Sequence, residues 1–96
     1  MKDYEKIYKR KEEIEEIFEN TGSELHKIEG DNAFLGLQIL SKYTQKNLIE
    51  GAGHDVIWSV QVDDAIELNI TDEDVTELAR LNWFIDSEGD CFSCFV

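Results

Sequence analysis

The chain begins with apolar positions that recur at three- and four-residue steps between charged ones. This period is typical of an amphipathic helix whose apolar stripe faces a core. The apolar positions are Tyr4, Ile7, Tyr8, Ile14, Ile17 and Phe18. Gly22 can take the left-handed conformation that commonly follows a helix C-terminus. The pattern predicts a helix over residues 3–20 that packs on the core. A dimer seam is the alternative, although Lys11 interrupts its heptad repeat.

The segment "GDNAFLGLQILSKYTQKN" predicts a second helix, with Asp31 placed to act as its N-cap. Apolar side chains cover most of its circumference, so we expect it to be buried on more than one side. These side chains are Ala33, Phe34, Leu35, Leu37, Ile39 and Leu40. A glycine inside a helix costs up to about 1 kcal/mol relative to alanine. We therefore expect Gly36 to allow the close approach of another element.

Three further patterns follow the break "EGAG" at residues 50–53. "HDVIWSVQV" is rich in β-branched and aromatic residues and predicts a strand. "TDEDVTELARLN" predicts a helix with Thr71 as N-cap and Asp74 three residues later, where its carboxylate can reach back. "WFID", "SEGD" and "CFSCFV" predict a strand, a turn and a last strand, which together form a hairpin.

The predicted order is helix, helix, strand, helix, strand, strand (ααβαββ). This order favours an α+β fold in which helices cover one face of a short, mostly antiparallel three-stranded sheet. The 96 residues contain no proline, repeat or low-complexity segment that would mark a linker. We therefore expect a single domain over residues 1–96.

The distribution of charge says more about function than the overall composition does. The net charge is −13, and residues 51–96 carry eleven acids against one base, Arg80. Direct binding to nucleic acid would need a basic patch, and the short "YKRK" run is followed at once by glutamates. No stretch approaches the roughly 20 apolar residues of a membrane span, and no secretory signal is visible. We expect a cytoplasmic protein that binds neither nucleic acid nor membrane directly.

Acidic residues are dense between residues 63 and 77. Helix capping explains Asp72, Glu73 and Asp74. Four acids have no such local explanation, and with others near the C-terminus they could form one negative face. These four are Asp63, Asp64, Glu67 and Glu77; the others are Asp55, Asp86, Glu88 and Asp90. Such a face suits a partner surface that otherwise holds nucleic-acid phosphates. The alternative is a solvated face that keeps the protein soluble.

The two cysteines, Cys91 and Cys94, have the C-x₂-C spacing of a zinc site. His26 and His54 would have to supply the other two ligands. Against this, successive residues of a strand face opposite sides, so Cys91 and Cys94, three residues apart, would point to different faces, and one metal would need a turn at residues 91–94. The alternatives are two small apolar core residues, which would alternate with the neighbouring phenylalanines, or a redox pair.

Catalytic motifs are absent: the sequence has no phosphate loop, dinucleotide fingerprint, HExxH or GxSxG pattern. His54 and Asp55 are adjacent, so on a strand they would point to opposite faces. We expect a binding protein rather than an enzyme. A hydrolase or nuclease that uses carboxylates and a divalent ion is a residual alternative.

The C-terminal half, "GAGHDVIWSVQVDD" through "LNITDEDVTELARLNWFIDSEGDCFSCFV", resembles small acidic proteins encoded by tailed phages and prophages. The shared features are a His-Asp pair entering a strand, a Thr-x-Glu-Asp helix start, and a hydrophobic-acidic hairpin that ends in Phe-Val. The resemblance implies a protein that binds and blocks host machinery, such as CRISPR effectors, restriction enzymes or polymerases. It implies no catalytic residues and does not extend to the N-terminal helix.

Two functional hypotheses follow. The first is a phage-derived, anti-CRISPR-like inhibitor, whose nucleic-acid-mimicking face (Asp63, Asp64, Glu67 and Glu77) binds a basic host protein. The alternative is a small zinc-stabilised domain with Cys91, Cys94, His54 and His26 as ligands and a partner unrelated to charge. In either case we expect a monomer or a weak dimer.

Overall fold

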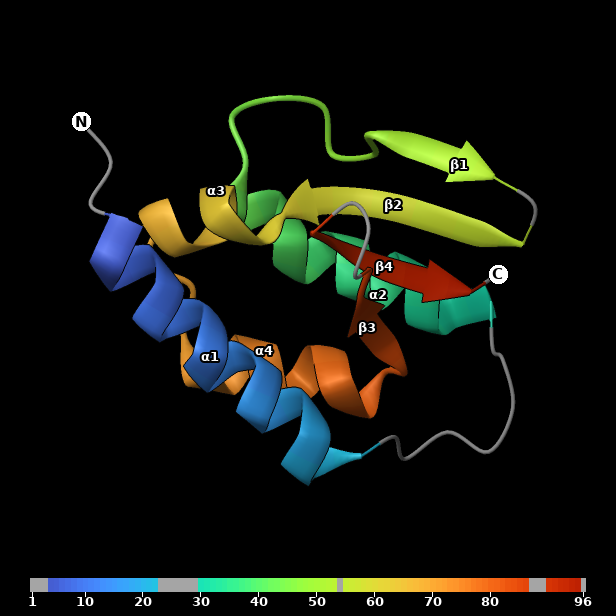
Figure 1. The fold of residues 1–96 in the computed structure, drawn as a ribbon. Helices are drawn as coiled ribbons and strands as arrows, with labels where there is room; N and C mark the ends of the chain where they lie inside the picture. Colours follow the sequence, from blue (N-terminus) through green and yellow to red (C-terminus); the bar gives the residue numbers. More distant parts are fainter. Residues whose placement is uncertain (1–3, 23–29, 54, 87–89, 96) are drawn as a thin grey trace.

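A four-stranded antiparallel sheet with helices packed on one face forms the fold (Figure 1). The computed structural model describes residues 4–22, 30–53, 55–86 and 90–95. The helices are α1 (Tyr4–Thr21), α2 (Gly30–Leu40), α3 (Val62–Glu67) and α4 (Asp72–Arg80), with a 3₁₀ turn at Ser41–Tyr43. The strands are β1 (Gly51–Gly53), β2 (Val56–Gln61), β3 (Trp83–Ile85) and β4 (Cys91–Phe95).

The strands lie in the order β1-β2-β4-β3, so β1 and β3 form the two edges. Ile57 on β2 and Trp83 on β3 both pair with Cys94 on the central strand β4, which places these three side chains on the same face. Trp58 and Phe84 likewise pair with Ser93 and belong to the opposite face. The register between β2 and β4 shifts after Trp58, so β2 ends in an irregularity just before α3.

The core lies between the helices and the sheet face that carries Phe92 and Cys94. The Phe92 ring packs against Phe18 of α1, with ring centroids 6.2 Å apart. All four helices and β2, β3 and β4 contribute buried apolar side chains to one cluster. Its fully enclosed members include Ile14, Leu40, Val60, Val62, Val75, Leu78 and Phe92. The described elements therefore share one core.

The α+β class is confirmed, but the predicted element order is wrong in two places. "GAG", expected to be a break, forms the edge strand β1. Its glycines leave room for the ring of Trp58: a Cβ on Gly53 would lie 2.6 Å from that indole. Val62, expected at the end of the strand "HDVIWSVQV", instead begins α3 together with residues 63–67, to which no element was assigned; the first turn of α3 carries Asp63 and Asp64. The result is four strands and four helices rather than ααβαββ.

Two local predictions are confirmed. Thr71 caps α4, because its side-chain oxygen accepts a hydrogen bond from the backbone N–H of Asp74 at 3.1 Å. The hairpin is also present, since β3 and β4 pair antiparallel. Its predicted turn falls at residues 87–89, which lie outside the described residues.

The predicted core is wrong at two pairs of residues. Tyr4 and Tyr8 are 64% and 67% exposed, although they share the apolar stripe of α1. An 18-residue helix is about 27 Å long, and the N-terminal end of α1 extends beyond the sheet (Figure 1). Phe34 and Leu35 are also exposed, so α2 is buried on one side only.

The start of α2 also differs from the prediction. The helix begins at Gly30, which places Asp31 in its first turn rather than at the N-cap. None of the described helices combines the length and the apolar character needed to cross a membrane.

Candidate acidic binding surface

The C-terminal half of α1 carries a row of exposed carboxylates. Glu12, Glu16 and Glu19 are all exposed and follow one another at four- and three-residue steps. These steps place them on the same side of the helix, about 6 Å and about 4.5 Å apart along its axis. Within the part of the chain that the structure describes, no cation lies at ion-pair distance from any of the three. Their charge is therefore directed to solvent.

This arrangement does not stabilise α1. Like charges at Glu12 and Glu16, and at Glu16 and Glu19, repel by about 0.2–0.5 kcal/mol for each pair. Glu19 lies in the last turn, where the partial negative charge of the helix dipole also opposes a carboxylate. The last turn contains no basic residue that would compensate.

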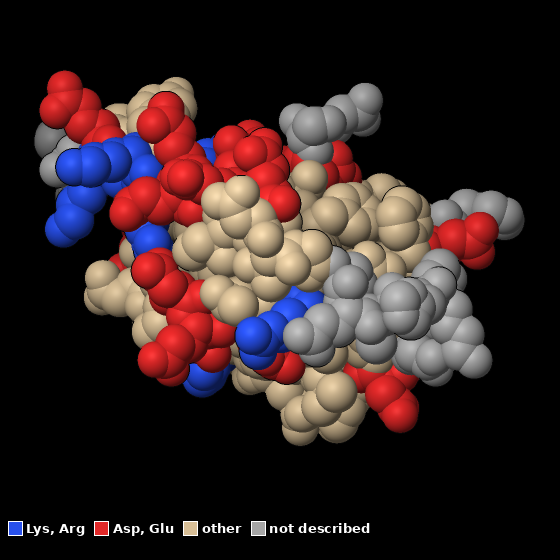
Figure 2. Space-filling view, turned by 90° about the horizontal axis from the view of Figure 1, so that it is seen from below, with Lys and Arg blue, Asp and Glu red and all other residues tan. Residues whose placement is uncertain are grey.

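Helix α4 extends the acidic surface beside α1. Asp72, Glu73 and Glu77 are exposed, and α1 and α4 pack together. A hollow of about 380 Å³ lies between the two helices, with Glu13, Glu16 and Asp72 on its walls. Figure 2 shows acidic side chains gathered over part of this side of the molecule, with basic ones among and beside them. We call this the α1–α4 surface; it comprises Glu12, Glu13, Glu16, Glu19, Asp72, Glu73 and Glu77.

Several basic side chains of the described region are held by acids of the same chain. Arg10 lies 2.6 Å from the carboxylate of Asp72 and donates a hydrogen bond to the backbone oxygen of Ile70 at 2.8 Å. Lys11 lies 3.0 Å from Asp90. Burial alone would lower the pKa of Lys11, but the hydrogen bond and charge of Asp90 raise it above its usual value. These cations anchor α1 to the rest of the fold.

One further cation, Lys42, is also held by an acid of the same chain. Lys42 lies 2.7 Å from Asp74, and Tyr43 donates a hydrogen bond to the same carboxylate. Burial alone would raise the pKa of Asp74, but the hydrogen bonds from Lys42, Tyr43 and Thr71 lower it below its usual value. Asp74 is therefore a structural anion and is not available to a partner.

The four acids predicted from the sequence do not gather on one surface. Asp64 and Glu67 share a hollow of about 240 Å³ with Lys46, whose Nζ lies 3.8 Å from Asp64. Asp63 is half-buried and contributes to the positive shift of the Lys11 pKa. Glu77 lies on α4, 3.8 Å from Arg80, and belongs to the α1–α4 surface.

The other predicted members of that face also have separate positions. Asp86 accepts a hydrogen bond from the indole Nε1 of Trp58 at 2.5 Å. Asp90 pairs with Lys11, and Asp55 is exposed beside β2. Glu88 lies outside the described residues.

The glutamates of α1 were missed because the same helix also carries four bases, so its net charge is small. The available signal is the segregation of charge along α1: its bases end at Lys11, and all acids but Glu5 follow.

The two cysteines lie on a regular strand and point to opposite faces of it. Cys94 faces the core, where the side-chain amide of Asn32 donates to its sulfur at 3.2 Å. Cys91 faces the other side, with its sulfur 3.7 Å from Glu50 Oε2. Burial raises the pKa of both thiols, that of Cys91 to about 11 with a further contribution from Glu50. Both therefore remain protonated at neutral pH, which disfavours redox chemistry.

The predicted zinc ligands cannot all be placed. His26 and His54 lie outside the described residues, and a single ion cannot be held by Cys91 and Cys94 while β4 keeps its pleat. Among the described side chains, no group of three or more His, Cys, Asp or Glu has an arrangement suited to a metal ion.

No protein-family model matches the chain, and no curated protein and no solved structure matches it at a significant level.

Proposed function

We propose that this protein acts by binding rather than by catalysis, and that its α1–α4 surface occupies a basic, nucleic-acid-binding surface of another protein. The observation that carries the proposal is the row of exposed carboxylates at Glu12, Glu16 and Glu19. A row of negative charges a few ångströms apart resembles the charge pattern of a nucleic-acid backbone. On the partner's nucleic-acid-binding surface, the lysines and arginines that hold phosphates are already positioned to pair with this row of carboxylates.

The conflict between charge and stability supports the same proposal. The row repels itself, and Glu19 opposes the dipole of its own helix. Two neighbouring bases of α1, Arg10 and Lys11, pair with Asp72 and Asp90 rather than with the row. A basic partner would relieve this repulsion. In the complex, the repulsion among the glutamates that destabilises the isolated protein is removed. The release of counterions from the partner's surface also favours binding.

An aromatic contact is available beside the row. Tyr8 is 67% exposed and lies one turn before Glu12 on α1. Large aromatic side chains supply much of the binding energy at protein interfaces, whereas exposed charges mainly raise the association rate. In this proposal the acids attract and orient the partner, and Tyr8 provides an apolar anchor.

The partner class follows from the resemblance of the C-terminal half to small acidic phage proteins. A host defence enzyme with a nucleic-acid channel, such as a CRISPR nuclease or a restriction endonuclease, has the required basic surface. The protein would compete with nucleic acid for that channel and would act in the cytoplasm of the host cell.

The experiment uses purified CRISPR nucleases and restriction endonucleases from bacteria, and measures their DNA binding by fluorescence anisotropy with increasing amounts of the protein. The proposal predicts that at least one enzyme loses DNA binding. It also predicts that a triple variant, Glu12→Gln with Glu16→Gln and Glu73→Gln, competes at least tenfold less well.

A matched control separates this surface from the acids expected from the sequence. The variant Asp63→Asn with Asp64→Asn and Glu67→Gln removes the same number of charges outside the α1–α4 surface. It should compete as well as the unmodified protein. Equal competition by both variants, or loss of competition only in the control, would contradict the proposal.

A further inference from the structure

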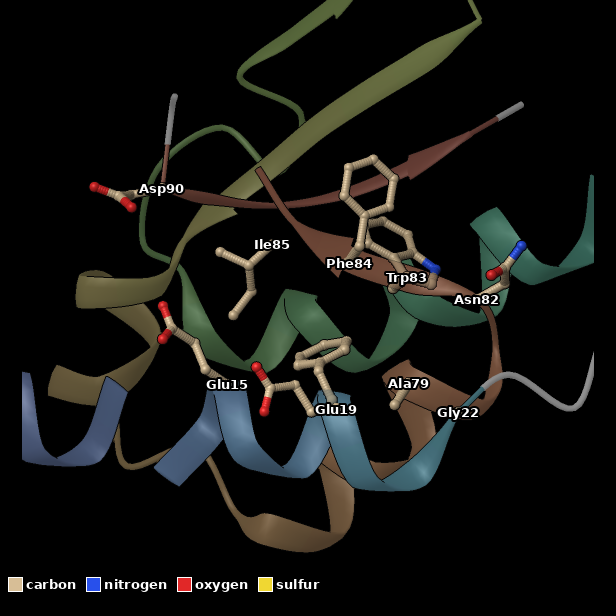
Figure 3. A pocket seen from close by; sticks show the side chains of 10 residues that line it. Glu15, Glu19, Gly22, Ala79, Asn82, Trp83, Phe84, Ile85 and Asp90 are labelled. Carbon is tan, nitrogen blue, oxygen red and sulfur yellow. The ribbon is translucent and has the colours of Figure 1, made fainter. Parts of the chain in front are cut away.

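A groove lies between α1 and the edge strand β3; Glu19 of the acidic row lines it, whereas Glu12 and Glu16 do not. It has a volume of about 540 Å³, within the usual range for ligand sites. Its apolar wall comprises Phe18 of α1, Ala79 of α4 and the three residues of β3. Glu15, Glu19 and Asp90 add carboxylates at its margin. Figure 3 shows Glu15 and Glu19 pointing from α1 toward β3, with Ile85 pointing back toward α1.

The backbone of β3 borders this groove with a strand edge. Asp86 donates a backbone hydrogen bond to Cys91 at 2.9 Å, and Phe84 pairs with Ser93 two residues earlier. In an antiparallel ladder, alternate residues bond to the neighbouring strand, and those between them direct N–H and C=O outward. Trp83 and Ile85 therefore present their backbone groups away from β4. An edge of this kind is a template for an added strand.

The two faces of the edge differ in chemistry. On the helix side, an added strand would meet the carboxylates of Glu15 and Glu19 above the ring of Phe18. On the opposite face it would meet Phe84, which stacks on the half-exposed ring of Phe95 with centroids 4.8 Å apart. Successive side chains of a strand point to opposite faces. The groove therefore matches a segment in which basic and apolar residues alternate.

We propose that this groove binds an extended peptide segment of the partner, with alternating basic and apolar residues, as an additional strand beside β3. Arginine or lysine stems would pack on Phe18 while their charged ends pair with Glu15 and Glu19. Valine, isoleucine or aromatic residues would pack on Phe84. The groove shares Glu19 with the α1–α4 surface but is otherwise lined by other residues, and its binding of a peptide does not depend on competition with DNA.

Charge complementarity selects this occupant over a second copy of the chain. Pairing of β3 with β3 of another molecule would bring the glutamates of two α1 helices close together. Each molecule carries a net charge of −13, so their approach is repulsive. A basic segment instead neutralises Glu15 and Glu19 at the margin of the groove, where Asp90 is already paired with Lys11.

The experiment uses a fluorescent, end-capped peptide, Val-Arg-Val-Arg-Val, titrated with the full chain and followed by anisotropy. We expect saturable binding that weakens with added salt. Two N-methylated versions test strand addition: one is methylated at the valines and the other at the arginines. Only alternate peptide N–H groups can bond to β3, so one version should bind at least tenfold more weakly while the other retains binding.

Charge variants complete the test. Glu15→Gln with Glu19→Gln should weaken binding of the peptide at least tenfold. Glu12→Gln with Glu16→Gln, the same change at two glutamates of α1 that do not line the groove, should not. No binding, equal sensitivity to both methylated versions, equal loss in both variants, or a dimer that the peptide dissociates in sedimentation velocity would overturn the proposal. Competition with DNA through Glu12, Glu16 and Glu73 can fail or succeed independently.

Discussion

A methyl group on Gly36 would lie 2.0 Å from the indole Nε1 of Trp83, so the absence of a side chain at Gly36 is what lets α2 lie against β3. The same indole donates a hydrogen bond to the backbone oxygen of Asn32, one turn earlier on α2, at 3.0 Å. Trp83 is thus fixed to α2 by packing and by a hydrogen bond. It is also a wall of the groove beside β3, so the contact with Gly36 positions that groove.

Replacing Gly36 with alanine should destabilise the protein although alanine is the better helix former. The new methyl group must displace a buried ring, and overpacking of this kind typically costs about 1–3 kcal/mol, more than the gain of about 1 kcal/mol in helix propensity. Urea unfolding followed by circular dichroism measures the difference. Gln38→Ala, on the exposed side of α2, is the control and should change stability by less than about 0.5 kcal/mol. A more stable G36A protein would refute the close contact.

Asp74 should contribute to stability in a pH-dependent way. Its pKa is lower in the folded protein than in the unfolded chain, so its contribution is present above the unfolded value of about 3.9 and is lost as the pH falls through the folded pKa. Asp74→Asn should destabilise the protein by about 1–3 kcal/mol at pH 7. The difference between the two proteins should narrow below about pH 4. A difference that stays constant down to pH 2 would contradict this assignment.

The sequence was informative where one local pattern decides the structure. The cap at Thr71, the hairpin from Trp83 and the role of Gly36 all follow from residue type and spacing. It was misleading where contacts between distant parts of the chain decide the secondary structure or the burial of a residue. Nothing local in "GAG" indicates a strand, because β1 depends on the ring of Trp58 lying over its glycines. Tyr4 continues the stripe of α1, but the sheet does not extend to it.

The acidic surface could be predicted only in part, for the same reason. Clustering along the chain marked Asp63 and Asp64, but folding sets Lys46 beside Asp64 and directs Asp63 toward Lys11. The acids of α1 form one surface with those of α4 because the two helices pack together, although they lie far apart in the sequence. Charge segregation along a helix is the local signal that would have identified them.

The buried thiols should make stability fall at high pH. The pKa of Cys91 is raised to about 11 in the folded protein, so its contribution to stability is complete below the unfolded value of about 8.5 and is lost as the pH rises toward 11. Chemical denaturation between pH 8 and pH 11 should show this loss, and Cys91→Ala should reduce it. If C91A follows the same pH dependence as the unmodified protein, the thiol is not its source.

The same property predicts slow alkylation. At pH 8 both Cys91 and Cys94 should react with iodoacetamide far more slowly than in the urea-unfolded chain, since little thiolate is present and both side chains are buried. Mass spectrometry over time gives the rates. Equal rates in the folded and unfolded chain would contradict the burial of β4.

Removing charge from α1 should stabilise the isolated protein. Glu12→Gln with Glu16→Gln eliminates the repulsion between these two residues and that between each of them and the neighbouring glutamates. At about 0.2–0.5 kcal/mol for each pair, the gain should be roughly 0.5–1.5 kcal/mol at low salt, and it should shrink as salt is added. Thermal unfolding at low and high ionic strength measures it. A loss of stability would mean that these acids have a structural role within the chain.

The most direct test of the proposed function is competition with DNA on a susceptible nuclease, measured for the unmodified protein and for the variant with Glu12→Gln, Glu16→Gln and Glu73→Gln. The account predicts that the variant is at least as stable as the unmodified protein and competes at least tenfold less well, and that raising the salt concentration weakens competition by the unmodified protein. A stable variant that still displaces DNA with unchanged affinity would show that the α1–α4 surface is not the binding site.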